Sequence, residues 1–358
     1  FYVNTIFDDN SRVSAALTAG VWTHVAGSFD GQKLRLFING VLAEEKDYAT
    51  PITHSSDPLM VGDLSGFGYY PFYGQLDETR LWNRALSAED VAAGMARRQA
   101  GAADGLAAFI AGLAKEKHLD IAGVFDERGN YRYKDFWDFL KVYEAACTTL
   151  QRPEDFYRLT LAVLEESAKN GVVYSETFLS PDFCGGRDVG AWREYLHAIQ
   201  EAADKAQATM GITLKGIVTC IRHFGPEKAR QTARCAAETA GDFIVGFGIA
   251  GDEKIGKPKD FLWSFDCARE AGLRITAHAG EWNGPDEVRA AVRDLGVERV
   301  GHGVRAIEDL ALVDELAEKG VVLECCPGSN VALGIYPSFR AHPIAELDRR
   351  GVKVTINT

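Results

Sequence analysis

Histidine and glutamate side chains follow two short apolar runs in the last third of the sequence. His278 and Glu281 come at the end of the run that begins at Leu273, and His302 follows the run that begins at Val297. A neutral imidazole is a strong zinc ligand, and a glycine after it lets a nearby carboxylate approach the same site. A partly desolvated carboxyl group there can hold a proton near neutral pH and donate it. The spacing therefore indicates metal or acid–base chemistry, with Glu281 as the acid or base.

Each of these residues also has a purely structural interpretation. A single histidine at the end of a strand is more often hydrogen-bonded within the fold than bound to a metal, and a single glutamate near a turn is usually solvated. Spacing alone leaves both interpretations open. Repetition favours the chemical one, because two successive runs end in histidine followed by glycine, or by alanine and glycine.

Helices alternate with short apolar runs from about residue 107 onwards, which is typical of a parallel sheet with crossover helices. The expected strands are residues 172–178, 214–221, 243–249, 273–277, 297–301, 321–325 and 352–357. Seven such units favour a (β/α)8 barrel that lacks one strand over a doubly wound sheet. Polar residues at the carboxyl ends of the strands should then converge on one face, where barrels carry their chemistry.

The front of the chain, to about residue 83, has the pattern of an antiparallel meander. Residues 21–26 and 34–38 alternate between apolar and polar side chains, and the pairs Asp30-Gly31 and Asn39-Gly40 flank the second run. Such pairs are strong hairpin signals because both tolerate positive φ. The chain is therefore expected to be multidomain, with an all-β part followed by the α/β barrel and residues 98–106 as the linker.

Composition excludes several classes of protein. The formal net charge of −12 argues against a nucleic-acid partner, because such proteins need clustered lysine and arginine. No window approaches the roughly 20 apolar residues that span a bilayer, so no membrane partner is expected. The seven cysteines are odd in number and none has C-x-x-C spacing, so neither a disulfide framework nor a thiolate zinc cluster is indicated. Cysteine usage favours a cytoplasmic location for the second part.

Several motifs in the second part resemble the adenosine and AMP deaminase family in their order and spacing. They are T-A-H-A-G-E at 276–281, R-V-G-H-G at 299–303, L-E-C-C-P-G-S-N at 323–330, H-P at 342–343 and V-T-I-N-T at 354–358. Upstream, Y-S-E-T-F-L-S-P at 174–181, I-R-H-F-G-P-E at 221–227 and G-F-G-I-A-G-D-E at 246–253 also match. The resemblance covers residues 107–358 and implies a TIM barrel that deaminates purines with Zn²⁺.

The resemblance also implies a role for individual residues. His278 would be a zinc ligand, and Glu281 would protonate the purine ring nitrogen beside the reacting carbon. His302 would hold the attacking water and handle its proton, and the backbone of Gly251 would hydrogen-bond the purine. The implied reaction converts adenosine, a small purine nucleoside, to inosine and ammonia. Gly248 stands where the commoner family pattern has aspartate, which favours a divergent subfamily and leaves adenine or a modified adenosine monophosphate as alternative substrates.

Two elements of the family pattern are absent from the sequence. The family's first barrel strand carries a His-x-His pair of zinc ligands and its last strand ends in paired aspartates. The histidines here are residues 24, 54, 118, 197, 223, 278, 302 and 342, so no two are two apart. We therefore expect a fragment, with a barrel at 107–358 that lacks its first strand and its C-terminal end. One surviving protein ligand also predicts weak zinc binding and poor deamination.

The front part resembles a laminin G-like or concanavalin A-like jelly roll. The resemblance rests on W-T-H-V-A-G-S-F-D-G, L-F-I-N-G and G-Q-L-D-E-T-R-L-W-N-R-A-L-S, covers residues 1–97 and implies a truncated domain. It offers an alternative function, a carbohydrate- or protein-binding module with an inactive barrel, and an extracellular location. Calcium at Asp63 or Asp77 and a sugar platform of aromatic residues 69, 70, 72 and 73 compete with the simpler interpretation of turn and packing residues.

Overall fold

The computed structural model describes residues 9–18, 21, 23–52, 105–121, 123–126 and 131–357, together with the isolated positions 85, 87, 88 and 91. It separates into two compact units. The first comprises Phe1–Gly105, Glu127–Gly129 and Lys169–Gly171, and the second comprises Leu106–Asp126, Asn130–Ala168 and Val172–Thr358. Aspartates 63 and 77, the aromatic residues 69 to 73 and most of the expected linker lie outside the described residues.

The first unit contains an antiparallel sheet in the order β1-β2-β3. Its strands are β1 (Val25–Phe29), β2 (Lys33–Ile38) and β3 (Val41–Asp47). Asn39 and Gly40 have φ of 51° and 77°, the left-handed conformation that a tight two-residue hairpin requires. The meander is thus confirmed, but the first strand begins at Val25 and not at residue 21. Val25 pairs with Ile38, the last residue of the partner strand β2. The N–H of His24, the residue before β1, donates to the side-chain oxygen of Asn39 in the turn.

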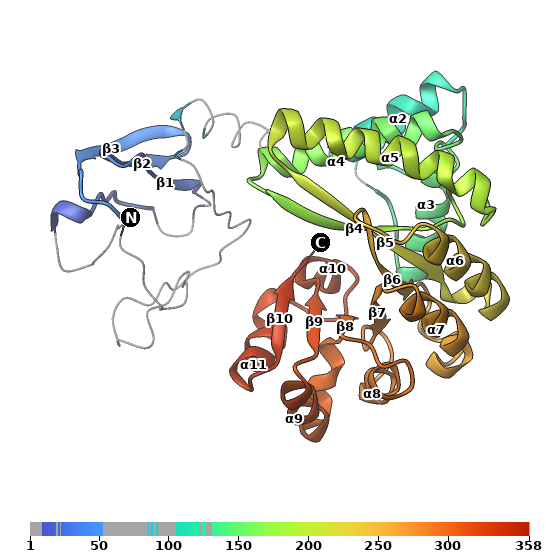
Figure 1. Ribbon diagram of the computed structural model, residues 1–358. Helices are drawn as coiled ribbons and strands as arrows, with labels where there is room; N and C mark the ends of the chain where they lie inside the picture. The colour runs from blue at the N-terminus through green and yellow to red at the C-terminus, as the bar shows by residue number, and fades with distance from the viewer. Residues whose placement is uncertain are drawn as a thin grey trace. The chain divides into compact units, whose positions relative to one another are not determined.

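The second unit is built on a curled, wholly parallel sheet in the order β10-β9-β8-β7-β6-β5-β4 (Figure 1). The strands are β4 (Tyr174–Leu179), β5 (Thr213–Ile221), β6 (Ile244–Ala250), β7 (Arg274–Ala279), β8 (Arg299–His302), β9 (Val322–Cys325) and β10 (Lys353–Ile356). All seven expected strands are present. Among the described residues β4 and β10 each pair on one side only, so the incomplete barrel predicted from sequence is confirmed.

Helices precede the first of these strands and connect successive strands, and most of them lie outside the curled sheet (Figure 1). They are α2 (Gly105–Glu116), α3 (Phe136–Cys147), α4 (Pro153–Lys169), α5 (Val189–Met210), α6 (Pro226–Glu238), α7 (Leu262–Glu270), α8 (Pro285–Asp294), α9 (Leu310–Lys319), α10 (Pro327–Ala332) and α11 (Ile344–Arg349). Short 3-10 turns occupy Asp9–Ser11, Arg222–Phe224, Pro258–Phe261, Val304–Glu308 and Phe339–Ala341. Every helix among the described residues is too short or too polar to span a lipid bilayer.

Local sequence signals explain where these helices begin and end. Helix α9 begins after Asp309, whose side chain accepts hydrogen bonds from two backbone N–H groups of the first turn. Gly320 follows its last residue and has a φ of 65°, the left-handed conformation in which glycine commonly ends a helix. Helices α6 and α8 each have proline in the first turn, where the missing N–H costs nothing. Their apolar faces pack on the sheet and form one continuous core.

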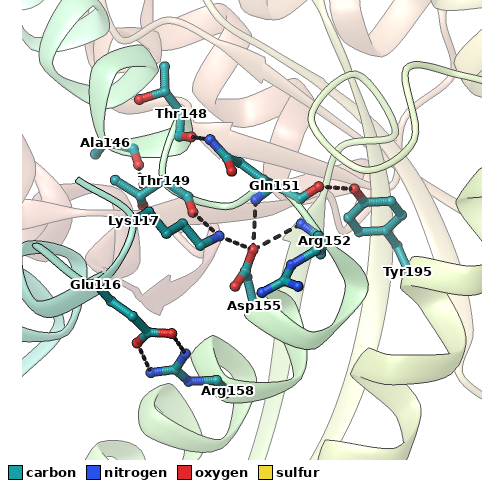
Figure 2. Close-up of polar contacts among 10 residues, drawn as sticks. All are labelled: Glu116, Lys117, Ala146, Thr148, Thr149, Gln151, Arg152, Asp155, Arg158 and Tyr195. Atoms are coloured by element: carbon teal, nitrogen blue, oxygen red, sulfur yellow. Dashed lines mark hydrogen bonds and ion pairs between the residues drawn. The ribbon is translucent and has the colours of Figure 1, made fainter. Parts of the chain in front are cut away.

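A buried ion pair fastens helix α4 to the residue that follows α2 (Figure 2). The carboxylate of Asp155 contacts the ammonium of Lys117 and accepts hydrogen bonds of 2.9 Å from the N–H groups of Gln151 and Arg152. Lys117 also donates to the carbonyl of Thr149 at 2.8 Å. Burial by itself raises the pKa of Asp155, but these hydrogen bonds outweigh it and lower the pKa. The cluster therefore joins three successive segments at their turns.

Polar side chains meet inside the curl of the sheet. Arg299 on β8 contacts Glu176 on β4 at 2.7 Å and Glu324 on β9 at 3.0 Å. Strands β8 and β4 are four positions apart in the sheet, which would separate them by about 19 Å if it were flat. One arginine side chain bridges them only because the sheet curls. The inward faces of the strands are therefore close enough to build a common site at their carboxyl ends.

Candidate active site

The four residues singled out in the sequence line one cavity of about 250 Å³. Gly251 follows β6, His278 lies within β7, Glu281 follows β7 and His302 is the last residue of β8. Parallel strands bring their carboxyl ends to the same edge, so residues up to 51 positions apart in sequence meet here. The structure thus brings His278, Glu281 and His302 together at one cavity.

The strand expected from sequence ended at residue 277, but β7 continues through Ala279, which still pairs with β8. His278 therefore lies inside the strand. Its Nδ1 is 3.2 Å from the carbonyl oxygen of Ile249, and a carbonyl only accepts, so Nδ1 carries the hydrogen. The lone pair is thereby assigned to Nε2. Removal of water around the ring lowers the pKa of His278 to about 4, so the imidazole is neutral at pH 7.

Glu281 is a buried carboxyl group at the wall of the cavity. Burial, followed by the nearby carboxylate of Glu253, raises the pKa of Glu281 to about 8. The hydrogen bond from the amide nitrogen of Asn330, at 3.3 Å, acts in the opposite direction and does not cancel the shift. Glu281 is therefore protonated at neutral pH and placed to donate a proton to a bound molecule.

His302 is a second neutral imidazole beside the first. Its ring centroid lies 5.3 Å from that of His278, and its Nδ1 is 3.1 Å from the amide nitrogen of Asn330. Burial, followed by the neighbouring His278, lowers the pKa of His302 to about 3. The backbone of His302 has a φ of 61°, an uncommon conformation for a side chain of this size, which places the ring at the turn after β8.

Gly251 forms part of the cavity wall by its backbone. Its φ of +99° is one that side chains rarely adopt, and a Cβ atom there would lie 2.8 Å from Nδ1 of His223. Glycine is therefore required at this position, where it lets the backbone approach the interior of the cavity. This agrees with an expected backbone contact to a purine, but no atom of the structure tests that contact.

The rest of the cavity is mostly apolar and aromatic. Its lining includes Phe136, Phe139, Tyr143, Phe178 and Phe183. Flat aromatic walls suit a flat heteroaromatic ligand. Glu144 also lines the cavity, whereas no lysine or arginine is among its lining residues, so the described part of the chain offers no cation to a phosphate group there.

Three buried residues that hold the site in place were not singled out from the sequence. Glu253 accepts hydrogen bonds from the successive N–H groups of Glu281, Trp282 and Asn283 at 3.0, 3.2 and 2.9 Å. Asn330 and His342 contact each other behind the cavity, where Asn330 also reaches Glu281 and His302. Each lies in a motif that the sequence does show, in A-G-D-E, P-G-S-N and H-P, but nothing in the letters indicates what these residues bond.

The described residues do not make a complete zinc site. A catalytic zinc takes about three protein ligands, and no group of three or more histidine, cysteine, aspartate or glutamate residues in the described ranges is arranged to hold a metal. His278 alone has the arrangement of a metal ligand, with Nδ1 bonded to a carbonyl and Nε2 left with its lone pair. The donor set expected from the family pattern is thus represented by a single imidazole.

Comparison with known proteins agrees with this picture. Residues 125–358 match the family model described as adenosine deaminase, and residues 1–92 match that of the concanavalin A-like lectin/glucanases superfamily. An adenine deaminase from Chelativorans sp. (strain BNC1) is 42% identical over 251 residues, which are 70% of this chain and 77% of the relative. A crystal structure of an adenine deaminase from Arthrobacter aurescens superposes with a TM-score of 0.64 at 29% identity, covering 72% of this chain and 78% of the other.

A more distant structure shares the fold alone. It is an amidohydrolase from Burkholderia ambifaria with bound zinc, at 24% identity and a TM-score of 0.59, covering 72% of each chain.

Proposed function

The chain belongs to the adenosine deaminase family, and from this premise we propose that its cavity binds adenine and supports hydrolytic deamination of the base. The proposal is carried by one observation, the convergence of a protonated carboxyl, Glu281, with two neutral imidazoles, His278 and His302, on one aromatic-walled cavity. In this reaction water adds to the carbon that bears the amino group, and ammonia leaves.

The residues of the chain divide the work by their protonation states. Glu281 gives its proton to the ring nitrogen beside the reacting carbon, so the negative charge that develops when water adds is neutralised on that ring. His302 holds the water oxygen near this carbon. The backbone of Gly251 approaches the edge of the purine. When the tetrahedral intermediate collapses, the amino group takes up the proton that the attacking water released and departs as ammonia. The hydroxyl left on the carbon returns a proton to Glu281 as the carbonyl forms.

Four features support free adenine over adenosine or a nucleoside monophosphate. The relative from Chelativorans, 42% identical, is an adenine deaminase. The cavity of about 250 Å³ lies just below the range of roughly 300 to 1,000 Å³ usual for larger ligands. Glu144 in the lining, without a lysine or arginine beside it, disfavours a phosphate group by like-charge repulsion. Gly248 stands where the commoner family pattern has aspartate, which favours a divergent subfamily and a substrate other than adenosine.

Zinc is the metal that family membership implies, and His278 is the residue proposed to bind it. The described residues supply only this one imidazole, so we expect the 358-residue polypeptide by itself to hold zinc weakly and to turn over slowly. The alternative function, a carbohydrate- or protein-binding module with an inactive barrel, stays a prediction, as do the cytoplasmic or extracellular locations.

Calorimetry separates substrate choice from turnover. Titration of the full chain with adenine, adenosine and AMP should give the highest affinity for adenine and none measurable for AMP. Preferred binding of AMP would contradict the proposal. The rate of ammonia release is then measured for the wild type and for Glu281→Gln, both with zinc added to the buffer. The substitution should lower this rate by about 10²- to 10⁴-fold because the proton donor is lost. Equal rates would remove Glu281 from the chemistry.

A further inference from the structure

Four hydrogen bonds link a row of polar groups behind the cavity. The N–H of Ile344, the first residue of helix α11, lies 3.3 Å from Nδ1 of His342. Nε2 of His342 lies 3.0 Å from Oδ1 of Asn330. The amide nitrogen of Asn330 lies 3.1 Å from Nδ1 of His302 and 3.3 Å from Oε1 of Glu281. Asn330 is fully buried and His342 nearly so, and polar groups at that depth are stable only when they are hydrogen-bonded.

We propose that Asn330 and His342 are positioning residues that fix the tautomer of His302, so that its Nδ1 carries no hydrogen and its Nε2 presents an N–H to the cavity. The assignment starts from a group that has only one role. A backbone N–H donates and never accepts, so the N–H of Ile344 makes Nδ1 of His342 the acceptor. The remaining hydrogen of the neutral imidazole is then on Nε2.

Each following step leaves one arrangement. Because Nε2–H of His342 donates, the atom of Asn330 that faces it is the amide oxygen, and the NH₂ group points the other way. That NH₂ group has two hydrogens, and the two acceptors within reach are Nδ1 of His302 and Oε1 of Glu281. His302 therefore holds its hydrogen on Nε2, for which the described residues provide no hydrogen-bond partner.

The opposite orientation of the Asn330 amide is disfavoured by a clash between donors. It would place the NH₂ group against Nε2–H of His342, so His342 would have to move its hydrogen to Nδ1. Nδ1–H would then face the N–H of Ile344, and two donors would oppose each other in a buried place. Leaving buried polar groups unpaired is costly enough to select one orientation.

This inference rests on the proposed function only for what Nε2–H does in the reaction. There it would donate a hydrogen bond to the water oxygen and orient it. The expectation from sequence that His302 also takes the proton of that water is then replaced by transfer of this proton to the departing amino group. The tautomer itself is a property of the ligand-free chain, so it is measured without adenine. Failure of adenine to bind would overturn the proposed function and leave the tautomer assignment standing.

The test is nitrogen NMR of the full 358-residue chain with ¹⁵N-labelled histidine, at neutral pH and without ligand. Correlations between ring protons and ring nitrogens distinguish a nitrogen that carries hydrogen from one that does not, and His302→Gln identifies the signals of His302. The expected pattern is a bare Nδ1 and a protonated Nε2. A protonated Nδ1 in the wild type would overturn the proposal.

Variants add a direct test of the two positioning residues. Asn330→Asp keeps the shape and the acceptor for His342 but replaces the NH₂ group by a carboxylate oxygen, so the hydrogen of His302 should move to Nδ1. A folded variant with the wild-type pattern would overturn the role of Asn330. Asn39→Asp, the same change in the hairpin of the first unit, is the matched control and should leave His302 unaltered.

His342 is tested by a conservative pair. Gln at this position offers a donor for Asn330 and an acceptor for the N–H of Ile344, whereas leucine offers neither. His342→Gln should keep the wild-type nitrogen pattern, and His342→Leu should give a mixture of tautomers. Identical patterns in both variants would overturn the role of His342, because packing alone would then fix His302.

Discussion

The rings of His278 and His302 stand edge to face, with centroids 5.3 Å apart and planes at 62°. Nδ1 of His278 faces a carbonyl oxygen, which makes it a donor, whereas Nδ1 of His302 faces the amide nitrogen of Asn330. The two neighbouring imidazoles are therefore assigned opposite tautomers. One offers a lone pair and the other an N–H to the same cavity, which is the division expected between a metal ligand and a group that holds water.

The pH dependence of stability should report the protonated state of Glu281. Its pKa is raised from 4.5 to about 8, so the native state binds more protons than the unfolded state between these values. Stability linked to this group is complete below about pH 4.5 and is lost as the pH rises through 8. Between pH 5 and 8 the wild type should therefore lose at least about 1.4 kcal/mol more than Glu281→Gln, the equivalent of one pKa unit.

Urea unfolding at several pH values measures this difference. Glu318→Gln, on the exposed face of helix α9, is the control and should follow the wild type. Parallel curves for the wild type and Glu281→Gln would show that Glu281 is ionised in the native state at neutral pH.

The two ion pairs of Figure 2 should differ in their effect on stability. Asp155→Ala removes a side chain that is 1% exposed and leaves Lys117 buried without its counter-ion, so it should cost about 3–5 kcal/mol. Glu116→Ala breaks the solvent-exposed contact with Arg158, which water and salt screen, so it should leave the stability almost unchanged. Chemical denaturation of both variants measures the contrast, and equal losses would contradict the structural role given to Lys117 and Asp155.

Gly280, in the turn between His278 and Glu281, should not tolerate alanine. Its φ is +73° and a Cβ atom there would collide with the side chain of Val288 in helix α8. Gly280→Ala should cost about 1–3 kcal/mol for the backbone conformation and a similar amount for overpacking. Gly112→Ala lies in helix α2 with open space around it and should be neutral or stabilise by up to about 1 kcal/mol. A comparison of melting temperatures decides between these outcomes.

Metal content tests the donor set directly. The full chain, purified without chelators and dialysed against metal-free buffer, should hold much less than one zinc per chain by plasma mass spectrometry, since one imidazole is too few ligands. His278→Ala should lower even this residual zinc. One tightly held zinc per chain would contradict the prediction and would require ligands beyond those that the described residues bring together.

Much of the second unit follows from local pattern. The apolar runs and the capping residues that separate them depend on neighbours in sequence, so all seven strands of the parallel sheet could be predicted. The rule that parallel strands bring their carboxyl ends together then placed His278, Glu281 and His302 at one edge. The sequence likewise predicted the hairpin at Asn39 and Gly40, since positive φ is a property of single residues.

The tertiary structure alone decided which groups bond to which. Arg299 reaches Glu176 only because the sheet curls, and Glu253 holds the turn after β7 because two loops from different strands are in contact. Asn330 and His342, twelve residues apart, meet beneath His302. A hydrogen bond forms or fails on a change of a few tenths of an ångström in the distance between two groups. Here the groups come from segments that are remote in sequence, and no local pattern of residue types contains the distance between them.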